Sequence, residues 1–351
     1  MDNRYKQIIP APNRVGTQTL VFNNRPSVAS MAAIAGDLEG EGTFGDHYDM
    51  VLTDDLWGEE TWEKAESKMF EEVVRKALAK DNLDEKWVEC LIGGDLLNQI
   101  IAANFAARQL GLPFLGVYGA CSTMAESLLV GSVLISGGFM SCVACAASSH
   151  FSTAERQYRS PLEMGTQRTP TAQRTVTGAG CTILVGPGSG SSKGIEITHG
   201  TVGKVVDLGI TDANNMGAAM APAATDSICA HLADTGRTVD DYDLIVTGDL
   251  GALGSELTRE LCLKKGVDLK DKYLDCGDSI FTKEQDMKAG GSGCGCSAVV
   301  LNSYLLKEMM SSKYNRILFL ATGALLSVDS TQQGESIPCV AHGVVFERRM
   351  G

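Results

Sequence analysis

Apolar side chains recur every three or four positions between Thr61 and Lys80, and charged residues fill the gaps. The apolar positions of this segment are Ala65, Met69, Val73, Val74, Ala77 and Leu78. Such spacing forms one hydrophobic stripe and predicts an amphipathic helix over 61–80. Similar spacing predicts two further helices, over 98–110 and 124–136.

Short, nearly continuous apolar runs lie between these helices and predict buried strands. The predicted strands are 87–92, 114–118 and 141–147 in the first half, and 242–247 and 316–322 in the second. The second half also predicts a helix over 220–233 and another that opens near Cys296 and runs to Met310. The first 45 residues are rich in Asn, Gly and Ser and predict a strand near Thr19–Phe22 with loops around it. The alternation of helices and strands predicts an α/β fold.

The chain repeats its own pattern, which predicts two similar halves. Gly94-Asp95-Leu96 ends one predicted strand, and Gly248-Asp249-Leu250 ends the matching strand of the second half. Gly119-Ala-Cys121-Ser122 opens a helix, as Cys296-Ser297 does later in the chain. We expect the halves to span 1–187 and 188–351. Because such strand-to-helix turns line the ligand crevice of α/β sheets, the paired turns are expected to face one another across a pseudo-twofold axis.

Charge and composition indicate which kinds of binding partner and which compartment suit the chain. The chain has 30 Lys and Arg against 43 Asp and Glu, a net charge of −13, without the basic clusters that neutralise phosphates. This balance argues against nucleic acid and against direct binding to anionic lipid. Eleven scattered cysteines indicate a reducing compartment rather than a disulfide framework.

Two segments bear on targeting. Residues 1–6, Met-Asp-Asn-Arg-Tyr-Lys, are not followed by an apolar core, so we expect no secretory signal. The uncharged stretch 127–147 is long enough to suggest a membrane span. However, Gly137-Gly138 divides it into a short helix and a short strand, so we expect it to be buried core.

Several sequence blocks carry a family resemblance. The Gly119-Ala-Cys121-Ser122 turn, the duplicated halves and the closing Pro338-Cys-Val-Ala-His342-Gly343 segment resemble the thiolase and ketoacyl-synthase superfamily. This resemblance covers the whole chain and implies a duplicated, thiolase-like fold with α-β-α-β-α layers.

Within that superfamily, the chain is most similar to the stage V sporulation protein AD family of spore-forming bacteria, also described as dipicolinic acid-binding. The blocks that carry the similarity are 94–99, 119–123, 148–157, 209–212, 219–223, 290–294 and 335–347. The resemblance implies that the protein binds pyridine-2,6-dicarboxylate without catalysis and without a cofactor. It also implies a peripheral location on the spore inner membrane, beside membrane subunits of a transport system. By analogy with the superfamily, a homodimer is also expected.

Chemistry is weighed separately from fold. Cys121 lies at a helix N-terminus, where the helix dipole favours a thiolate, so it could serve as an acyl-carrying nucleophile. Thiolases and ketoacyl synthases complete such a site with His or Asn from the second half. Here the corresponding loops carry Gly248-Asp249-Leu250 and Gly291-Ser292-Gly293 instead. His342 also stands outside a Gly-His-Pro motif. We therefore expect a binding protein rather than an enzyme, with a condensing or acyl-transfer enzyme using Cys121 as the alternative.

Pyridine-2,6-dicarboxylate is a planar dianion, and a protein that binds it needs hydrogen-bond donors at opposite ends of the ring. The candidates for ligand binding are Cys121, Ser122, His150, Arg156, Asp95, Asn98, Cys296 and His342. Amides at the Cys121 and Cys296 turns and the guanidinium of Arg156 suit carboxylates. The alternatives are that Arg156 forms an ordinary ion pair, that His150 caps a turn, and that Asp95 and Asn98 organise loops through backbone hydrogen bonds.

A metal site and a scaffold role are two further possibilities for this chain. Calcium could accompany the ligand by recruiting Asp95 or Asp249, but no calcium-loop spacing occurs in the chain, so no metal site is predicted. A further alternative is a scaffold for membrane partners whose pocket is vestigial.

Overall fold

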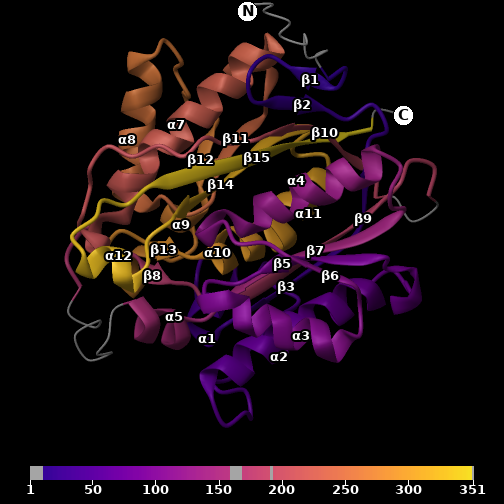
Figure 1. Cartoon of the computed structure of the whole chain (residues 1–351), viewed down its shortest axis with the longest axis horizontal. Coiled ribbons are helices and arrows are strands. Elements are labelled where there is room, and N and C mark those ends of the chain that lie inside the picture. The colour runs from indigo at the N-terminus through magenta and orange to yellow at the C-terminus, as the bar shows by residue number, and fades with distance from the viewer. Residues whose placement is uncertain (1–10, 159–167, 190–192, 350–351) are drawn as a thin grey trace, which may run out of the picture.

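The computed structural model describes residues 11–158, 168–189 and 193–349. The first six residues, on which the expected lack of a secretory signal rested, lie outside this part of the chain. Helices and strands alternate along the chain and build layers in which two helical layers cover the outside and a third lies between two sheet regions (Figure 1).

The strands follow one continuous path of hydrogen-bonded neighbours, in the order β12-β11-β14-β15-β10-β3-β9-β7-β5-β6. In the first half the strands are β3 (Ser27–Ala35), β5 (Cys90–Gly94), β6 (Phe114–Gly116), β7 (Cys142–Ser149) and β9 (Gly178–Val185). In the second half they are β10 (Ile195–Thr201), β11 (Leu244–Thr247), β12 (Tyr273–Asp275), β14 (Arg316–Ala324) and β15 (Cys339–Arg348). Short strands complete the structure: β1 (Arg14–Val15), β2 (Thr19–Val21), β4 (Met50–Val51), β8 (Arg174–Thr175) and β13 (Gly291–Ser292).

The path is symmetric about its middle. Outward from the seam, where Ser27 pairs with Glu196, the order is β3-β9-β7-β5-β6 on one side and β10-β15-β14-β11-β12 on the other. On both sides the two pairs nearest the seam are antiparallel and the two outer pairs are parallel. The duplicated α/β fold predicted from the repeat is therefore confirmed.

The helices divide among three layers. They are α1 (Asp37–Gly40), α2 (Trp62–Ala79), α3 (Ile101–Leu110), α4 (Thr123–Ser136), α5 (Phe151–Tyr158), α7 (Met216–Thr235), α8 (Gly251–Lys264), α9 (Cys276–Ser279), α10 (Cys294–Val300), α11 (Leu306–Met310) and α12 (Val328–Gln332). One turn of π-helix, Leu301–Leu305, joins α10 to α11. In Figure 1, α2 and α3 cover one outer face, α7 and α8 cover the other, and α4, α10 and α11 lie between the sheet regions.

Every helix predicted from apolar spacing is present, with ends within a few residues of the prediction. The helix expected over 61–80 is α2, whose N-terminus is capped by the Thr61 side chain accepting from the Lys64 N–H. The helix expected from residue 98 begins as a short 3-10 turn before α3, because Gln99 and Ile100 adopt positive φ angles of 56° and 47°.

The strand expected near Thr19–Phe22 is present as β2, but the expectation of loops in the rest of the first 45 residues is wrong. Residues 27–35 form β3, all nine of whose residues are buried at the centre of the sheet path. Its sequence, Ser-Val-Ala-Ser-Met-Ala-Ala-Ile-Ala, is dominated by small residues rather than branched ones. A strand covered on both faces has no reason to alternate apolar and polar residues, so periodicity could not reveal it.

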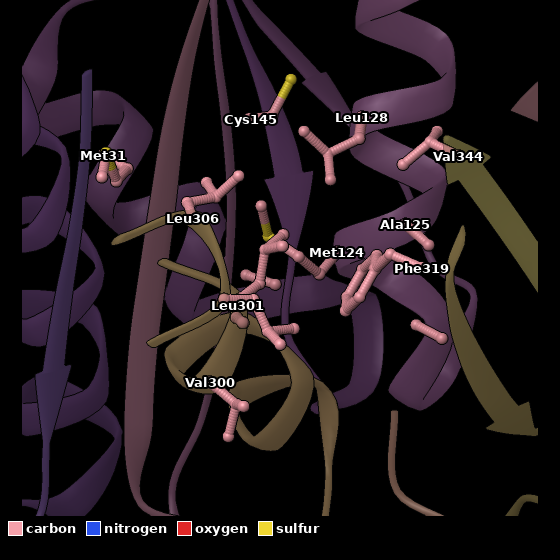
Figure 2. Close-up of a cluster of buried hydrophobic side chains, with 14 of the residues drawn as sticks. Met31, Met124, Ala125, Leu128, Cys145, Val300, Leu301, Leu306, Phe319 and Val344 are labelled. Atoms are coloured by element: carbon pink, nitrogen blue, oxygen red, sulfur yellow. The ribbon is translucent and has the colours of Figure 1, made fainter. Parts of the chain in front are cut away.

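Figure 2 shows the core of the middle layer. Met124, Ala125 and Leu128 project from α4 toward Leu301 of the π turn and Leu306 of α11, and Phe319 and Val344 close the cluster from β14 and β15. Helices of both halves thus share one hydrophobic core.

The uncharged stretch 127–147 forms most of α4 and β7, with Gly137-Gly138 between them, as predicted. Within the described part of the chain, each helix is either too short or too polar to cross a lipid bilayer.

Candidate functional site

Cys121 lies in a tight turn that leads from β6 into α4. Ala120 adopts a positive φ of 48°, and the Ser122 hydroxyl donates to the carbonyl oxygen of Gly119 at 2.7 Å. The Thr123 hydroxyl similarly donates to the Ala120 carbonyl at 2.6 Å. These two bonds hold the turn, so the Cys121 side chain, 6% exposed, is directed to the wall of a pocket.

The pocket beside Cys121 has a cavity volume of about 50 Å³. Its walls are formed by Leu96, Tyr118, Ala120, Cys121, Ala154, Glu155, Tyr158, Thr175, Ala213, Met216, Ser292, Ala324 and Leu326. Both halves of the chain contribute to these walls. The space is small compared with the ~300 to 1,000 Å³ of typical small-molecule sites.

The Cys121 thiol is hydrogen bonded to the carboxyl group of Asp249, at the turn after β11. Asp249 is fully buried. It also accepts from the Gly293 N–H at 2.9 Å, the Ser292 hydroxyl at 3.2 Å and the Thr322 hydroxyl at 2.7 Å. A network with so many donors fixes the carboxyl group beside the sulfur.

Burial raises the pKa of the Cys121 thiol well above its ordinary value, and the neighbouring Asp249 carboxyl raises it further. Both effects disfavour the thiolate and outweigh the helix dipole that the sequence analysis invoked. At neutral pH the sulfur therefore carries a proton and acts as a hydrogen-bond donor.

Two tyrosines form a flat part of the wall. The hydroxyls of Tyr118 and Tyr158 lie 3.0 Å apart, and Tyr158 also donates to the Leu96 carbonyl at 2.5 Å. Burial raises the pKa of both phenols, so both are neutral. Neutral hydroxyls offer hydrogen bonds to a ligand without contributing charge.

The charged residue on the wall is already paired. Glu155, 1% exposed, lies 3.2 Å from the guanidinium of Arg168, and the Thr175 hydroxyl is 3.4 Å from the same carboxylate oxygen. The negative charge of Glu155 is thus balanced within the protein.

The structure places Asn98 and Arg156 outside the Cys121 pocket. They lie together on a neighbouring surface hollow of about 420 Å³ that is also lined by Glu63 and Gln157. Arg156 is half-exposed and forms an ion pair with Glu63. The Cζ atom of its guanidinium lies 5.4 Å from the centroid of the Trp62 ring. The pair with Glu63 is the ordinary ion pair considered as an alternative, and a ligand role for Arg156 and Asn98 stays a prediction for the outer hollow.

The histidines also lie elsewhere. The Nε2 atom of His150 is 2.8 Å from the Asp55 carbonyl, and its Nδ1 accepts from the Ser152 N–H at 3.1 Å, so the ring caps the start of α5. The Nδ1 atom of His342 accepts from the Gly203 N–H at 3.2 Å. Burial lowers the pKa of both rings. The described residues include all five histidines of the chain, and none of these rings lines the Cys121 pocket.

The remaining predicted residues are held by backbone contacts or buried. Asp95 accepts from the N–H groups of Leu97 and Ala103 at 2.7 and 2.8 Å, the loop-organising role considered for it. Ser122 is bonded within its own turn, and Cys296 is fully buried and does not line the pocket. Among the described residues no cluster of three or more His, Cys, Asp or Glu is arranged to hold a metal ion.

Sequence reasoning missed several residues that line or flank the pocket. Asp249 was considered as a possible calcium ligand and Ser292 only as part of a loop that lacks the expected His or Asn, yet both belong to the network beside Cys121. The duplicated Gly-Asp-Leu turn was the signal for Asp249. Tyr118 and Tyr158 gave no signal, because a strand end and a helix end 40 residues apart meet only in the folded chain.

Solved structures with a similar fold are condensing enzymes. The structure resembles 3-oxoacyl-[acyl-carrier-protein] synthase III from Aquifex aeolicus with a TM-score of 0.57 and 14% identity, covering 92% of this chain and 99% of the other. It resembles human mitochondrial 3-ketoacyl-CoA thiolase with a TM-score of 0.59 and 12% identity, covering 93% and 99%. At this level of identity the likeness establishes the thiolase-like fold and nothing about activity.

Sequence comparison is more specific. Residues 16–347 match the sequence profile of the family described as stage V sporulation protein AD. Stage V sporulation protein AD of Bacillus subtilis (strain 168) is 47% identical over 336 residues, which cover 96% of this chain and 98% of that protein. The chain therefore belongs to the stage V sporulation protein AD family, a family of sporulation proteins built on the thiolase-like fold.

Proposed function

We propose that the pocket beside Cys121 binds dipicolinate, pyridine-2,6-dicarboxylate, reversibly and without catalysis during sporulation and germination. The observation that supports the absence of catalysis is the burial of the Cys121 thiol beside the buried Asp249 carboxyl group, which together raise the pKa of the thiol. A nucleophile must first lose its proton to a base, whereas here a neighbouring carboxyl group raises the pKa of the thiol.

The shape and chemistry of the pocket support a small, flat ligand. Tyr118 and Tyr158 provide neutral hydroxyls and aromatic surface on one side, and Met216 and Leu326 provide apolar surface from the second half. Ala120 and Cys121, in the turn that opens α4, line the pocket, and the N-terminal end of a helix suits a carboxylate. Because the cavity is only about 50 Å³, a bound ring would displace a half-exposed wall residue such as Tyr118, which is 43% exposed.

A chain of hollows leads outward from the pocket. Tyr118, Tyr158 and Leu326 also line a second hollow that includes Asn98, and Asn98 in turn borders the hollow of Arg156. A dianion approaching by this route passes the guanidinium of Arg156, which is paired with Glu63, before it reaches the neutral wall.

Family membership alone supports the proposed partners and location. In this proposal, the protein is a peripheral component on the spore inner membrane, held there by membrane subunits of the dipicolinate transport system. A homodimer, and calcium arriving with the ligand, are also part of the proposal.

One observation favours a second function, acyl transfer or condensation with Cys121 as the nucleophile. The thiol lies at a positive-φ turn that opens a helix, on a fold shared with a thiolase and a ketoacyl synthase. The raised pKa of the thiol argues against it.

Calorimetric titration with dipicolinate tests the binding proposal. The wild type is expected to bind. The variant Tyr158→Phe, which loses one hydroxyl from the wall, is expected to bind roughly fivefold more weakly, the equivalent of ~1 kcal/mol for one hydrogen bond. The matched control is Tyr304→Phe, whose ring packs against Phe44 far from this pocket and whose affinity should equal that of the wild type.

Two results would contradict the proposal. If the wild type gives no heat with dipicolinate but still captures transporter subunits, the protein is a scaffold with a vestigial pocket. If intact-protein mass analysis after incubation with acyl-CoA shows an acyl adduct that is lost in Cys121→Ala, the condensing enzyme is the better description.

A further inference from the structure

Two cysteines meet where α7 and α8 pack side by side, on the outer layer of the second half (Figure 1). The helices approach closely near their N-termini: a Cβ added to Gly254 would lie 2.8 Å from the Cα of Gly217. Toward their C-termini Cys229 on α7 packs against the buried cluster that contains Cys262 on α8, and each thiol affects the pKa of the other. The two cysteines are therefore neighbours across the helix pair.

The two thiols differ in exposure. Cys229 is half-buried and lines a surface groove of about 710 Å³, whereas the other ten cysteines are buried. Cys262 is fully buried in the cluster formed by Ile228, Leu232 and Leu269. A reagent that enters the groove reaches Cys229 first.

The surroundings of Cys229 favour its thiolate. The contact with Cys262 lowers its pKa, and the nearby ammonium of Lys265 adds to this effect. Lys265, Arg237 and Lys270 line the same groove together with Asp240 and Asp268. Partial exposure and a neighbouring cation are features that distinguish reactive cysteines from inert core thiols.

We propose that Cys229 and Cys262 form an oxidisable pair, with Cys229 attacking and Cys262 resolving, that reacts with low-molecular-weight disulfides in solution. The Cys229 thiolate attacks one sulfur of such a disulfide, forms a mixed disulfide and releases one thiolate, which takes up the proton that Cys229 gave up. The Cys262 thiol then loses its proton, attacks the Cys229 sulfur and releases the second small thiol. One small disulfide is thereby reduced to two thiols, and one protein disulfide joins α7 to α8.

The second step is helped by the first. In the reduced protein the hydrogen bond to Cys229 is the largest cause of the raised pKa of Cys262. Once Cys229 is in a mixed disulfide it carries no charge, so this cause is removed and Cys262 can ionise more readily. This inference is independent of the dipicolinate pocket, which lies near Cys121.

Oxidised glutathione and the reduced full-length chain test the pair. Peptide mapping without reductant is expected to show a disulfide between Cys229 and Cys262 that forms about tenfold faster than modification at any other cysteine. In Cys262→Ser the reaction should stop at glutathione on Cys229, and in Cys229→Ser neither product should form. Cys339→Ser, which removes a buried thiol elsewhere, should behave like the wild type.

Peptide mapping of the oxidised wild type tests the disulfide even if Cys262→Ser fails to fold. Cys262→Ala provides a second variant at the same position. Faster modification of another cysteine, or a glutathione adduct on wild-type Cys229 that never resolves to the internal disulfide, would overturn the assignment.

Discussion

At the scale of single residues, the Asp249 carboxyl group adds to the effect of burial on the Cys121 thiol. This carboxyl group is fully buried and accepts hydrogen bonds from the Gly293 N–H and the Thr322 hydroxyl as well as from the thiol. A negative charge beside the sulfur disfavours a second negative charge on it. A carboxyl group at this position therefore opposes formation of the thiolate.

Replacing Asp249 by Asn should make Cys121 more reactive. The amide keeps the shape and removes the charge, so the pKa of the thiol should fall from its raised value. The rate of alkylation by iodoacetamide, measured from pH 7 to 10, should rise about tenfold for each pKa unit lost, with its midpoint moved to lower pH.

Asp95→Asn is the matched control, because Asp95 occupies the same Gly-Asp-Leu turn in the first half and is not among the main causes of the raised pKa of Cys121. Its alkylation rate should stay within about twofold of the wild type at moderate ionic strength. An unchanged or slower rate in Asp249→Asn would show that burial alone holds the thiol protonated.

The sequence predicted Cys121 as a pocket residue but could not select its neighbours. His150 and His342 had suitable chemistry, yet their rings bond to backbone groups at other places in the fold. Tyr118 and Tyr158 line the pocket only because β6 and α5 end side by side. A side chain's direction within a turn depends on tertiary packing, which one sequence without its structure does not specify.

At the scale of elements, the two Gly-Asp-Leu turns do different work. Asp95 accepts backbone N–H groups at both ends of the segment 97–103 and so fixes the positive-φ entry to α3. Asp249 instead faces the loop of Ser292 and the thiol of Cys121. The same Gly-Asp-Leu turn therefore occurs in both halves with different roles. The turn of Asp95 stabilises the start of α3, and the turn of Asp249 lies beside Cys121.

Replacing Asp95 by Asn should therefore destabilise the fold through α3. One carboxyl oxygen becomes an NH₂ group that faces a backbone N–H, which leaves a buried donor unpaired and costs ~1 to 3 kcal/mol. Urea unfolding should show this loss, and amide exchange should be faster in α3. Asp84→Asn, at an exposed turn where the carboxylate accepts the Lys86 N–H, should change stability by less than ~0.5 kcal/mol. Equal losses in the two variants would contradict the role given to Asp95.

Helices and strands were predicted correctly where apolar residues recur periodically. They were missed where complete burial leaves no alternation of apolar and polar residues. The spacing of Met69, Val73 and Val74 identified α2 within a residue at each end. The fully buried β3 was missed, because Ser27, Ala29 and Ala32 carry neither β-branching nor alternation. Its position beside the seam could not be known without the sheet order.

At the scale of the whole molecule, the repeat seen in the sequence becomes a pseudo-twofold arrangement with one shared interior. We propose that the halves divide near residues 187 and 188, between β9 and β10, so that β3 and β10 occupy equivalent places beside the seam. The helices of the middle layer cross that division: α4 of the first half packs on β14 and β15 of the second. Neither half has a separate core on this side, so the halves should not unfold independently.

A core substitution in α4 tests this coupling. Leu128 is fully buried in the shared cluster, and Leu128→Ala should cost ~2 to 5 kcal/mol through lost burial and the cavity left behind. Because the cluster joins both halves, calorimetry should show one transition moved to lower temperature, with the calorimetric and van't Hoff enthalpies equal. Val133→Ala, on the same helix at a side chain that is 41% exposed, should change stability by less than ~0.5 kcal/mol. Two separated transitions in Leu128→Ala, with only one of them moved, would show instead that each half carries its own core and that the middle layer merely joins them.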